Sequence, residues 1–264
     1  MSSRGEASLF SAVRTGVSFE DCYFYHAMDI PGVGEVQGAW DLRKEVSAYL
    51  GHLDLAGKTV LEIGPASGFL TFEMERAGAS VTALEVPDEP GWDFVPFPAE
   101  VLEPLYGPRC EVMHQLKNSW WFNHHAFKSS ARLAYADVYA LPPELGRYDI
   151  AVMGSVLLHT KAPLQVIEQC ARHADILVIT DMLHPELEGS PVCRLVPSEL
   201  NVRWDTWWEF STDFLIQFLG VMGFRVEKNL HMQPHHGRDY SFFTLVARRV
   251  DKGMIWNTSS PIRD

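Results

Sequence analysis

A glycine-containing segment after a short apolar run is the first feature that could do chemistry. The run Thr59–Ile63 includes Glu62 and leads into Gly64, Pro65, Ala66, Ser67 and Gly68. Glycines at the end of a buried strand permit a tight turn and let the backbone approach a ligand closely. A dinucleotide fingerprint, G-x-G-x-x-G, would need glycines at 66 and 69 as well, where this chain has Ala66 and Phe69. The segment therefore predicts a ligand-binding turn of another kind, with an ordinary strand-to-helix turn as the alternative.

A second acidic residue, Glu85, closes the apolar run Ser80–Glu85 and lies 23 residues after Glu62. In nucleotide-binding α/β folds an acid about 20 residues after the glycine turn meets the ribose hydroxyls. A carboxylate can accept both hydrogens of a cis-diol, so Glu85 suits a ribose without a 2′-phosphate. The alternative is a solvated acid at a strand end.

Two further segments follow predicted strands. Asp137 and Val138 come after Arg132–Ala136, and Gly154 and Ser155 come after Asp149–Met153. The carboxyl ends of parallel strands face the ligand crevice in such folds.

The loop that begins at Gly154 continues into Leu157-Leu158-His159. A histidine can accept a proton near neutral pH, so His159 is the candidate general base. Anchoring of the loop is the alternative role for His159.

These segments need a sheet that brings the strand ends together. The predicted strands are Thr59–Ile63, Ser80–Glu85, Arg132–Ala136, Asp149–Met153 and Ile176–Thr180, and the predicted helices are about Ala39–His52, Gly68–Ala77, Pro163–His173 and Thr212–Met222. Short apolar runs separated by helices favour a parallel sheet covered on both faces. The last two strands, Phe224–Met232 and Tyr240–Arg249, have only seven residues between them. A parallel crossover needs a dozen or more, so they must pair antiparallel.

The acid, the glycine turn, Glu85 and the later strand ends, in this order, resemble class I S-adenosylmethionine (SAM)-dependent methyltransferases. Their motif is an acid followed by G-x-G-x-G, with Ala66 here in place of the middle glycine. The resemblance covers about residues 55–250 and implies a Rossmann-like α/β fold with a seven-stranded, mostly parallel sheet and an antiparallel C-terminal hairpin. It implies SAM as cofactor, S-adenosylhomocysteine (SAH) as product and no metal. The cofactor-binding residues it implies are Trp40, Arg43, Glu62, Gly64, Pro65, Ala66, Ser67, Gly68, Glu85, Val86, Asp137, Val138, Gly154 and Ser155.

Three short segments resemble the sequences of a narrower group. These are methyltransferase-like proteins related to the carboxymethyl-transferring enzymes of tRNA wobble uridine. The segments are residues 38–43, residues 157–163 and Thr206-Trp207-Trp208. Proteins of this kind also resemble enzymes that tailor sugars and natural products. The net charge of −12 and the lack of any basic run disfavour nucleic acid as a partner.

The expected organisation is an N-terminal arm or lid with a helix over 1–54, a SAM-binding core over 55–250, and a tail over 251–264. Residues 86–130 form an insertion rich in aromatic side chains. The substrate candidates are Trp92, Trp120, Trp121 and His235, and the alternative is that the insertion's aromatic residues form its own core. Trp40 and Arg43 are expected either to roof the cofactor or to pack a helix. Exposed aromatic residues could equally form a homodimer surface.

Four widely spaced cysteines, no signal-peptide core and no long apolar stretch favour a cytoplasmic protein that does not enter a membrane. The leading functional hypothesis is in-line transfer of a methyl group from SAM to an O or N atom of a small molecule or glycan. One alternative is a carboxymethyl or other SAM-analogue transferase acting on RNA, which needs a cation near the transferred group, with Arg43 as the candidate. Another is a non-catalytic SAM-binding protein. The acceptor, the donor variant and the oligomeric state stay open.

Overall fold

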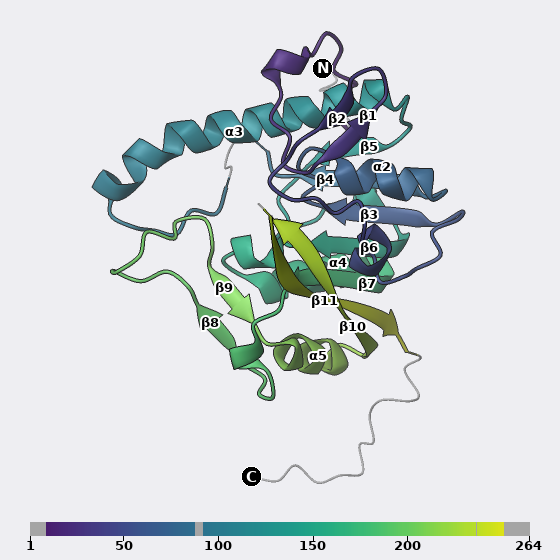
Figure 1. The fold of residues 1–264 in the computed structure, drawn as a ribbon. Helices are drawn as coiled ribbons and strands as arrows, with labels where there is room; N and C mark the ends of the chain where they lie inside the picture. Colours follow the sequence, from purple (N-terminus) through teal and green to yellow (C-terminus); the bar gives the residue numbers. More distant parts are fainter. Residues whose placement is uncertain (1–8, 88–91, 236, 251–264) are drawn as a thin grey trace, which may run out of the picture.

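The computed structural model describes residues 9–87, 92–235 and 237–250. Its centre is a seven-stranded sheet with the order β10-β11-β7-β6-β3-β4-β5 (Figure 1). The five parallel strands are β3 (Thr59–Ile63), β4 (Ser80–Glu85), β5 (Arg132–Tyr135), β6 (Tyr148–Gly154) and β7 (Ala174–Met182). The predicted α/β fold with a mostly parallel sheet is therefore confirmed. The predicted tail over 251–264 lies outside the described residues.

The antiparallel end of the sheet is also confirmed, with longer strands than expected. β10 (Phe224–His235) pairs with β11 (Arg238–Arg249), and β11 pairs antiparallel with β7. Most of the seven residues expected to form the connection belong to these strands, since β10 ends at His235 and β11 begins at Arg238. Pro234 fits within β10 because this strand is at the sheet edge, where a missing N–H breaks no ladder.

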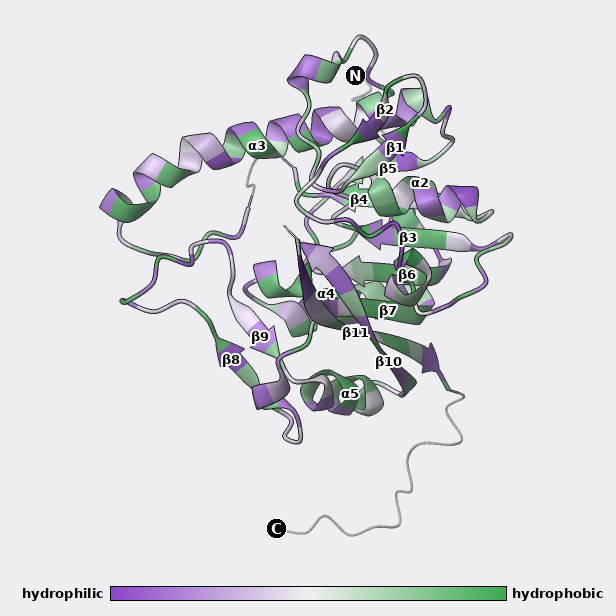
Figure 2. Cartoon of the chain, viewed as in Figure 1, coloured by the Kyte–Doolittle hydropathy of each residue, from purple (hydrophilic) through white to green (hydrophobic). Residues whose placement is uncertain are grey.

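Helices cover both faces of the sheet, and alternate strand residues face opposite sides. Leu61 and Met153 belong to the hydrophobic cluster shared with α4 (Pro163–His173) and α5 (Thr212–Val221). Val60 and Val152 belong to the cluster shared with α1 (Val46–Tyr49), α2 (Phe69–Arg76) and α3 (Ala99–Ala126). Figure 2 shows the central strands largely in the hydrophobic colour, as expected for strands buried on both faces.

The helix predicted over Ala39–His52 is wrong in its first half, since only Val46–Tyr49 is α-helical. Trp40 forms isolated β-bridges with His26 and His235 instead. Its backbone N–H donates to Tyr25, and its carbonyl accepts from Ala27. These partners are remote in the chain, and they satisfy backbone groups that a helix would have used internally.

The N-terminal arm contains a β-hairpin formed by β1 (Met28–Ile30) and β2 (Gly34–Val36), after a short 3-10 helix, η1 (Phe19–Asp21). Phe10 bridges to Ala134 of β5, so the start of the described chain runs along the sheet edge. Three more 3-10 helices and a small β-hairpin complete the fold: η2 (Pro143–Leu145), η3 (Leu157–His159), η4 (Pro185–Leu187), β8 (Cys193–Leu195) and β9 (Trp208–Phe210).

The insertion is dominated by α3, a helix of 28 residues. Its first turns extend away from the sheet, and its last turns lie over the body of the molecule (Figure 1). Trp120 and Trp121 are each 1% exposed and pack in the cluster with Phe72 of α2. Their burial favours the alternative of an aromatic core, and a substrate role for this pair stays a prediction. Within the described residues, no helix is both long enough and apolar enough to cross a membrane.

We expect Trp121→Ala to lower the free energy of unfolding by about 3–5 kcal/mol, because it leaves a large cavity between α3 and the sheet. Urea unfolding followed by far-UV circular dichroism measures this loss. Leu200→Ala is the control, since Leu200 is 93% exposed and should change stability by less than about 0.5 kcal/mol. Equal effects of the two substitutions would contradict the packing described for α3.

Candidate functional site

The order in which the chain adds strands to the sheet reverses between β3 and β6, which are parallel neighbours. β4 and β5 follow on one side of β3, whereas β6 and β7 lie on its other side. Loops that leave the carboxyl ends of β3 and β6 therefore diverge, which is where open α/β sheets bind ligands. The two loops at this point are Gly64–Gly68 and the segment from Ser155 to His159, both expected from the sequence to be functional.

The glycines of the first loop are required by its geometry. Gly64 has φ +69°, and a Cβ there would lie 2.7 Å from Cγ2 of Val156. Gly68 has φ +90°, and a Cβ there would lie 2.4 Å from the ring of Phe72. A side chain at either position would therefore both strain the backbone and force neighbouring atoms apart. The backbone of the loop therefore lies close to the side chains of Val156 and Phe72.

Two non-glycine residues at this edge also have left-handed backbone. Ala66 and Ser155 both have φ +50°. Such conformations cost roughly 1–3 kcal/mol each and cluster at ligand-binding sites. Ser155 is held by its N–H, which donates to the Thr180 carbonyl at 2.7 Å, and by its Oγ, which lies 3.1 Å from the Tyr49 hydroxyl. Strained backbone is therefore present both in the loop after β3 and in the loop after β6.

Glu62 lies inside the protein, only 2% exposed, where Thr71 of α2 donates a hydrogen bond to its carboxyl group. Trp120 of α3 donates in turn to the Thr71 hydroxyl at 3.1 Å. Burial raises the pKa of Glu62 to about 8, and the Thr71 hydrogen bond opposes this shift. Asn123 of α3 also donates to the Ser67 carbonyl at 2.8 Å. The insertion helix α3 thus holds the glycine loop through hydrogen bonds to Thr71 and to the Ser67 carbonyl.

Glu85 ends β4 beside this loop and is 7% exposed. Burial raises the pKa of its carboxyl group, while hydrogen bonds from the backbone N–H groups of Val86 and Ala66 lower it. The Val86 N–H lies 2.7 Å from Oε1. Asp137 is exposed after β5, and its Oδ1 accepts from the Tyr139 N–H at 2.9 Å. Both acids therefore lie at the carboxyl edge, as the sequence predicted.

His159 ends η3 at the same edge, and its Nδ1 lies 2.5 Å from the backbone carbonyl of Asp205. A carbonyl can only accept, so Nδ1 carries the hydrogen and Nε2 keeps a lone pair. Burial lowers the pKa of His159, opposed by the Asp205 carbonyl and side chain. The ring of Trp92 packs against the imidazole with centroids 5.0 Å apart. The side chain is thus both anchored and able to act as a base.

Arg43 and Trp40 are used within the N-terminal arm. The Arg43 guanidinium pairs with Asp29, Glu35 and Asp41 at 3.3, 3.0 and 2.7 Å, and these side chains raise its pKa. The prediction that Arg43 roofs the cofactor site is therefore not supported, because its charge is already balanced by three carboxylates.

Trp40 stacks on His235 at 4.1 Å between ring centroids and donates to the Tyr25 hydroxyl at 3.2 Å. The Nδ1 of His235 lies 2.7 Å from the Ala39 carbonyl. Trp40 therefore fastens the arm to the β10–β11 hairpin, and a substrate role for His235 stays a prediction.

Several side chains near the site escaped sequence reasoning. Tyr49 is buried against Gly154, where an added Cβ would lie 2.9 Å from the tyrosine ring. Its apolar spacing indicated only a packed helix. Arg109 lies on α3, a helix that the sequence analysis did not predict and that contains Pro104 and Pro108. His26 is half-buried beside Phe69, and burial lowers its pKa to about 4. No local pattern marked it.

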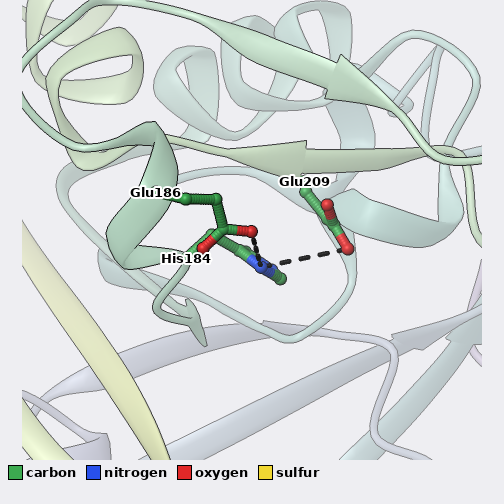
Figure 3. A group of neighbouring side chains, drawn as sticks. All are labelled: His184, Glu186 and Glu209. Carbon is green, nitrogen blue, oxygen red and sulfur yellow. Dashed lines mark ion pairs between the residues drawn. The ribbon is translucent and has the colours of Figure 1, made fainter.

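A cluster near the end of β7 combines His184, Glu186 and Glu209 (Figure 3). His184 Nδ1 lies 4.0 and 3.9 Å from the two carboxylates. Arg194 donates to both of them, at 2.7 Å to Glu186 and 2.6 Å to Glu209. A cation of the protein itself thus balances these charges, and the absence of a metal stays a prediction.

We expect Glu62→Gln to flatten the pH dependence of stability between about pH 5 and 8. The carboxyl group ionises near its ordinary pKa of 4.5 in the unfolded chain, whereas in the folded protein it keeps its proton to about pH 8. The stability it contributes is complete below pH 4.5 and is lost as the pH rises through 8. Some slope should remain, since burial also raises the pKa of Asp181 to about 7. Urea midpoints across this range measure the effect.

Glu144→Gln, at an exposed position, is the matched control and should leave the curve unchanged. A slope in Glu62→Gln as steep as that of the unmodified protein would show that Glu62 is ionised in the folded state.

No protein-family model and no curated protein matches this chain. Many solved structures do share its fold. The N-terminal domain of EvdMO1, solved in the presence of SAH and D-fucose, is 18% identical, with 85% of this chain and 90% of that chain covered and a TM-score of 0.55.

A 1,6-didemethyltoxoflavin-N1-methyltransferase from Burkholderia thailandensis is 19% identical, with 80% and 78% covered and a TM-score of 0.51. Magnesium protoporphyrin IX methyltransferase from Synechocystis is 14% identical, with 79% and 78% covered and a TM-score of 0.50. Together with the strand order and the antiparallel end of the sheet, these likenesses show that the chain has the Rossmann-like fold of the class I methyltransferases.

Proposed function

We propose that this protein binds SAM at the divergence of β3 and β6 and transfers its methyl group to an oxygen or nitrogen of a small molecule or glycan. The observation that carries the proposal is the arrangement at one sheet edge of a strained loop, an acid and a base. Gly64–Gly68, Glu85 and His159 all lie at the carboxyl ends of neighbouring strands. The neighbours by fold were solved with SAM or SAH bound, which supports the choice of cofactor.

The residues at this edge fit SAM by an independent criterion. The Ser67 hydroxyl and Nδ1 of His26 are buried and have no hydrogen-bond partner among the described residues. Buried polar atoms without partners are uncommon in proteins and indicate a ligand or water. Glu85 is a carboxylate acceptor beside the loop, suited to the two ribose hydroxyls. The backbone at Gly64–Gly68 would then lie against the ribose and methionine parts.

SAM supplies an electrophilic methyl group bound to a sulfonium. In-line attack by the acceptor on this methyl group releases SAH. His159 would accept the acceptor's proton on Nε2, because Nδ1 already donates to the Asp205 carbonyl. The same hydrogen bond holds the imidazole plane and stabilises the imidazolium after proton transfer. The ring of Trp92 packs against the imidazole and would exclude water from it.

The acceptor class is proposed from charge and from the side chains near His159. Trp92 packs against His159 and, together with Trp204, against the Arg109 guanidinium, and aromatic side chains of this kind suit sugars and aromatic rings. The net charge of −12 disfavours a nucleic-acid acceptor. For the alternative of carboxymethyl transfer to RNA, Arg43 is no longer a candidate, because three carboxylates engage it. A non-catalytic SAM-binding role would share the cofactor residues and lack turnover.

Glu85→Gln should weaken SAM and SAH binding by more than tenfold, since each hydrogen bond to a charged group is worth about 1.5–3 kcal/mol. Isothermal titration calorimetry with SAH measures the change. Asp93→Asn, which alters an acid outside the proposed ribose contact, is the control. Unchanged affinity in Glu85→Gln would remove the ribose role, and the absence of saturable SAH binding to the unmodified protein would remove the proposed function.

His159→Ala should lower kcat by about 10²–10⁴-fold and leave the Kd for SAH within about threefold. Turnover against a panel of hydroxylated and aminated small molecules gives the rate, and calorimetry gives the affinity. Because burial lowers the pKa of His159, activity of the unmodified protein should persist below pH 6.5 and fall only at lower pH. Equal losses of turnover and affinity would assign His159 a purely structural role.

A further inference from the structure

Arg109 is a cation on α3 that no carboxylate of the described residues pairs with. Within the part of the chain that the structure describes, no acid lies at ion-pair distance from it, and its Nε is buried without a hydrogen-bond partner. Two other arginines, by contrast, form ion pairs with acidic side chains. Arg43 pairs with three acids, and Arg194 pairs with Glu186 and Glu209. Arg109 therefore needs a separate explanation.

Aromatic rings hold this guanidinium in one place. Its central carbon lies 3.9 Å from the ring centroid of Trp92 and 5.7 Å from that of Trp204. A ring face attracts a cation, but it makes no hydrogen bond to the guanidinium N–H groups in the guanidinium plane. The stack thus orients Arg109 and leaves its in-plane donors available.

The position of Arg109 links it to the proposed site. Trp92 contacts Arg109 and also packs against His159. Burial lowers the pKa of Arg109, while Asp205, Tyr25 and Glu85 act in the opposite direction through their charges. Arg109 in turn lowers the pKa of His159. The guanidinium therefore lies within electrostatic range of both the proposed ribose acid and the proposed base.

We propose that Arg109 binds a carboxylate of the acceptor molecule, so that the substrate is an acid carrying the hydroxyl or amine to be methylated. This inference rests on the proposed function and specifies its substrate class. A planar guanidinium with free donors matches a carboxylate through two parallel hydrogen bonds. The trio Arg109, Trp92 and His159 would then fix the anionic end, the body and the reacting atom of the acceptor in turn.

The experiment measures binding of matched acid and neutral compounds to the full chain in the presence of saturating SAH. One pair is 4-hydroxybenzoate and 4-hydroxybenzamide, and the other is D-glucuronate and D-glucose, so the arms distinguish an aryl acid from a sugar acid. Isothermal titration calorimetry gives the Kd values. We expect one acid to bind at least tenfold more tightly than its neutral partner, because the half-buried guanidinium strengthens only the charged contact.

Arg109→Gln should reduce binding of that acid to the level of its neutral partner, and Arg109→Lys should give an intermediate Kd because it keeps the charge and loses the planar fork. Arg225→Gln removes the same charge from an exposed position on β10 and should change nothing. Thermal melting verifies that each variant is folded.

Equal affinity for acid and neutral compounds, no measurable binding of either acid, or an unaltered Kd in Arg109→Gln would each overturn the inference. So would a loss of SAH affinity in Arg109→Gln, since it would place the cofactor's own carboxylate on this residue. The proposed function fails separately, through absent SAH binding by the unmodified protein.

Discussion

Parallel pairing of β3 with both β4 and β6 is the constraint on which the site depends. The chain adds β4 and β5 on one side of β3, and β6 and β7 on the other side. The loops after β3 and β6 therefore separate and leave the strand ends accessible. Ala66 and Ser155 are held in left-handed backbone on the two sides of this gap. The hydrophobic clusters on both faces of the sheet supply the stability against which such local strain is maintained.

The insertion helix is coupled to the glycine loop through a buried polar chain. Trp120 donates to Thr71, Thr71 donates to Glu62, and Asn123 donates to the Ser67 carbonyl. These hydrogen bonds join side chains of β3, α2 and α3 to the glycine loop, so the loop, α2 and α3 must assemble together. The same helix carries Arg109 toward His159. One long element therefore supports the proposed cofactor side and supplies the proposed acceptor side.

The electrostatics at the site differ from those of the surface. The protein is acidic overall, yet the charged side chain stacked on Trp92 is an arginine with no acid paired to it in the described structure. His159 is kept neutral by burial, and its Nδ1 is occupied by the Asp205 carbonyl. A neutral base beside a fixed cation suits an acceptor that arrives negatively charged and must lose a proton before attack.

Local sequence patterns alone determined the parallel strands, the glycine turn and the acids at strand ends, because apolar periodicity and turn chemistry depend on near neighbours. Thr59–Ile63 and Pro163–His173 were predicted to the residue. Tertiary structure decided the rest. Trp40 bridges to His26 and to His235 of β10, Trp120 and Trp121 are buried in the cluster with α2, and Arg43 is paired with acids while Arg109 has none among the described residues. These outcomes depend on contacts between residues far apart in the chain, which only the assembled fold brings together.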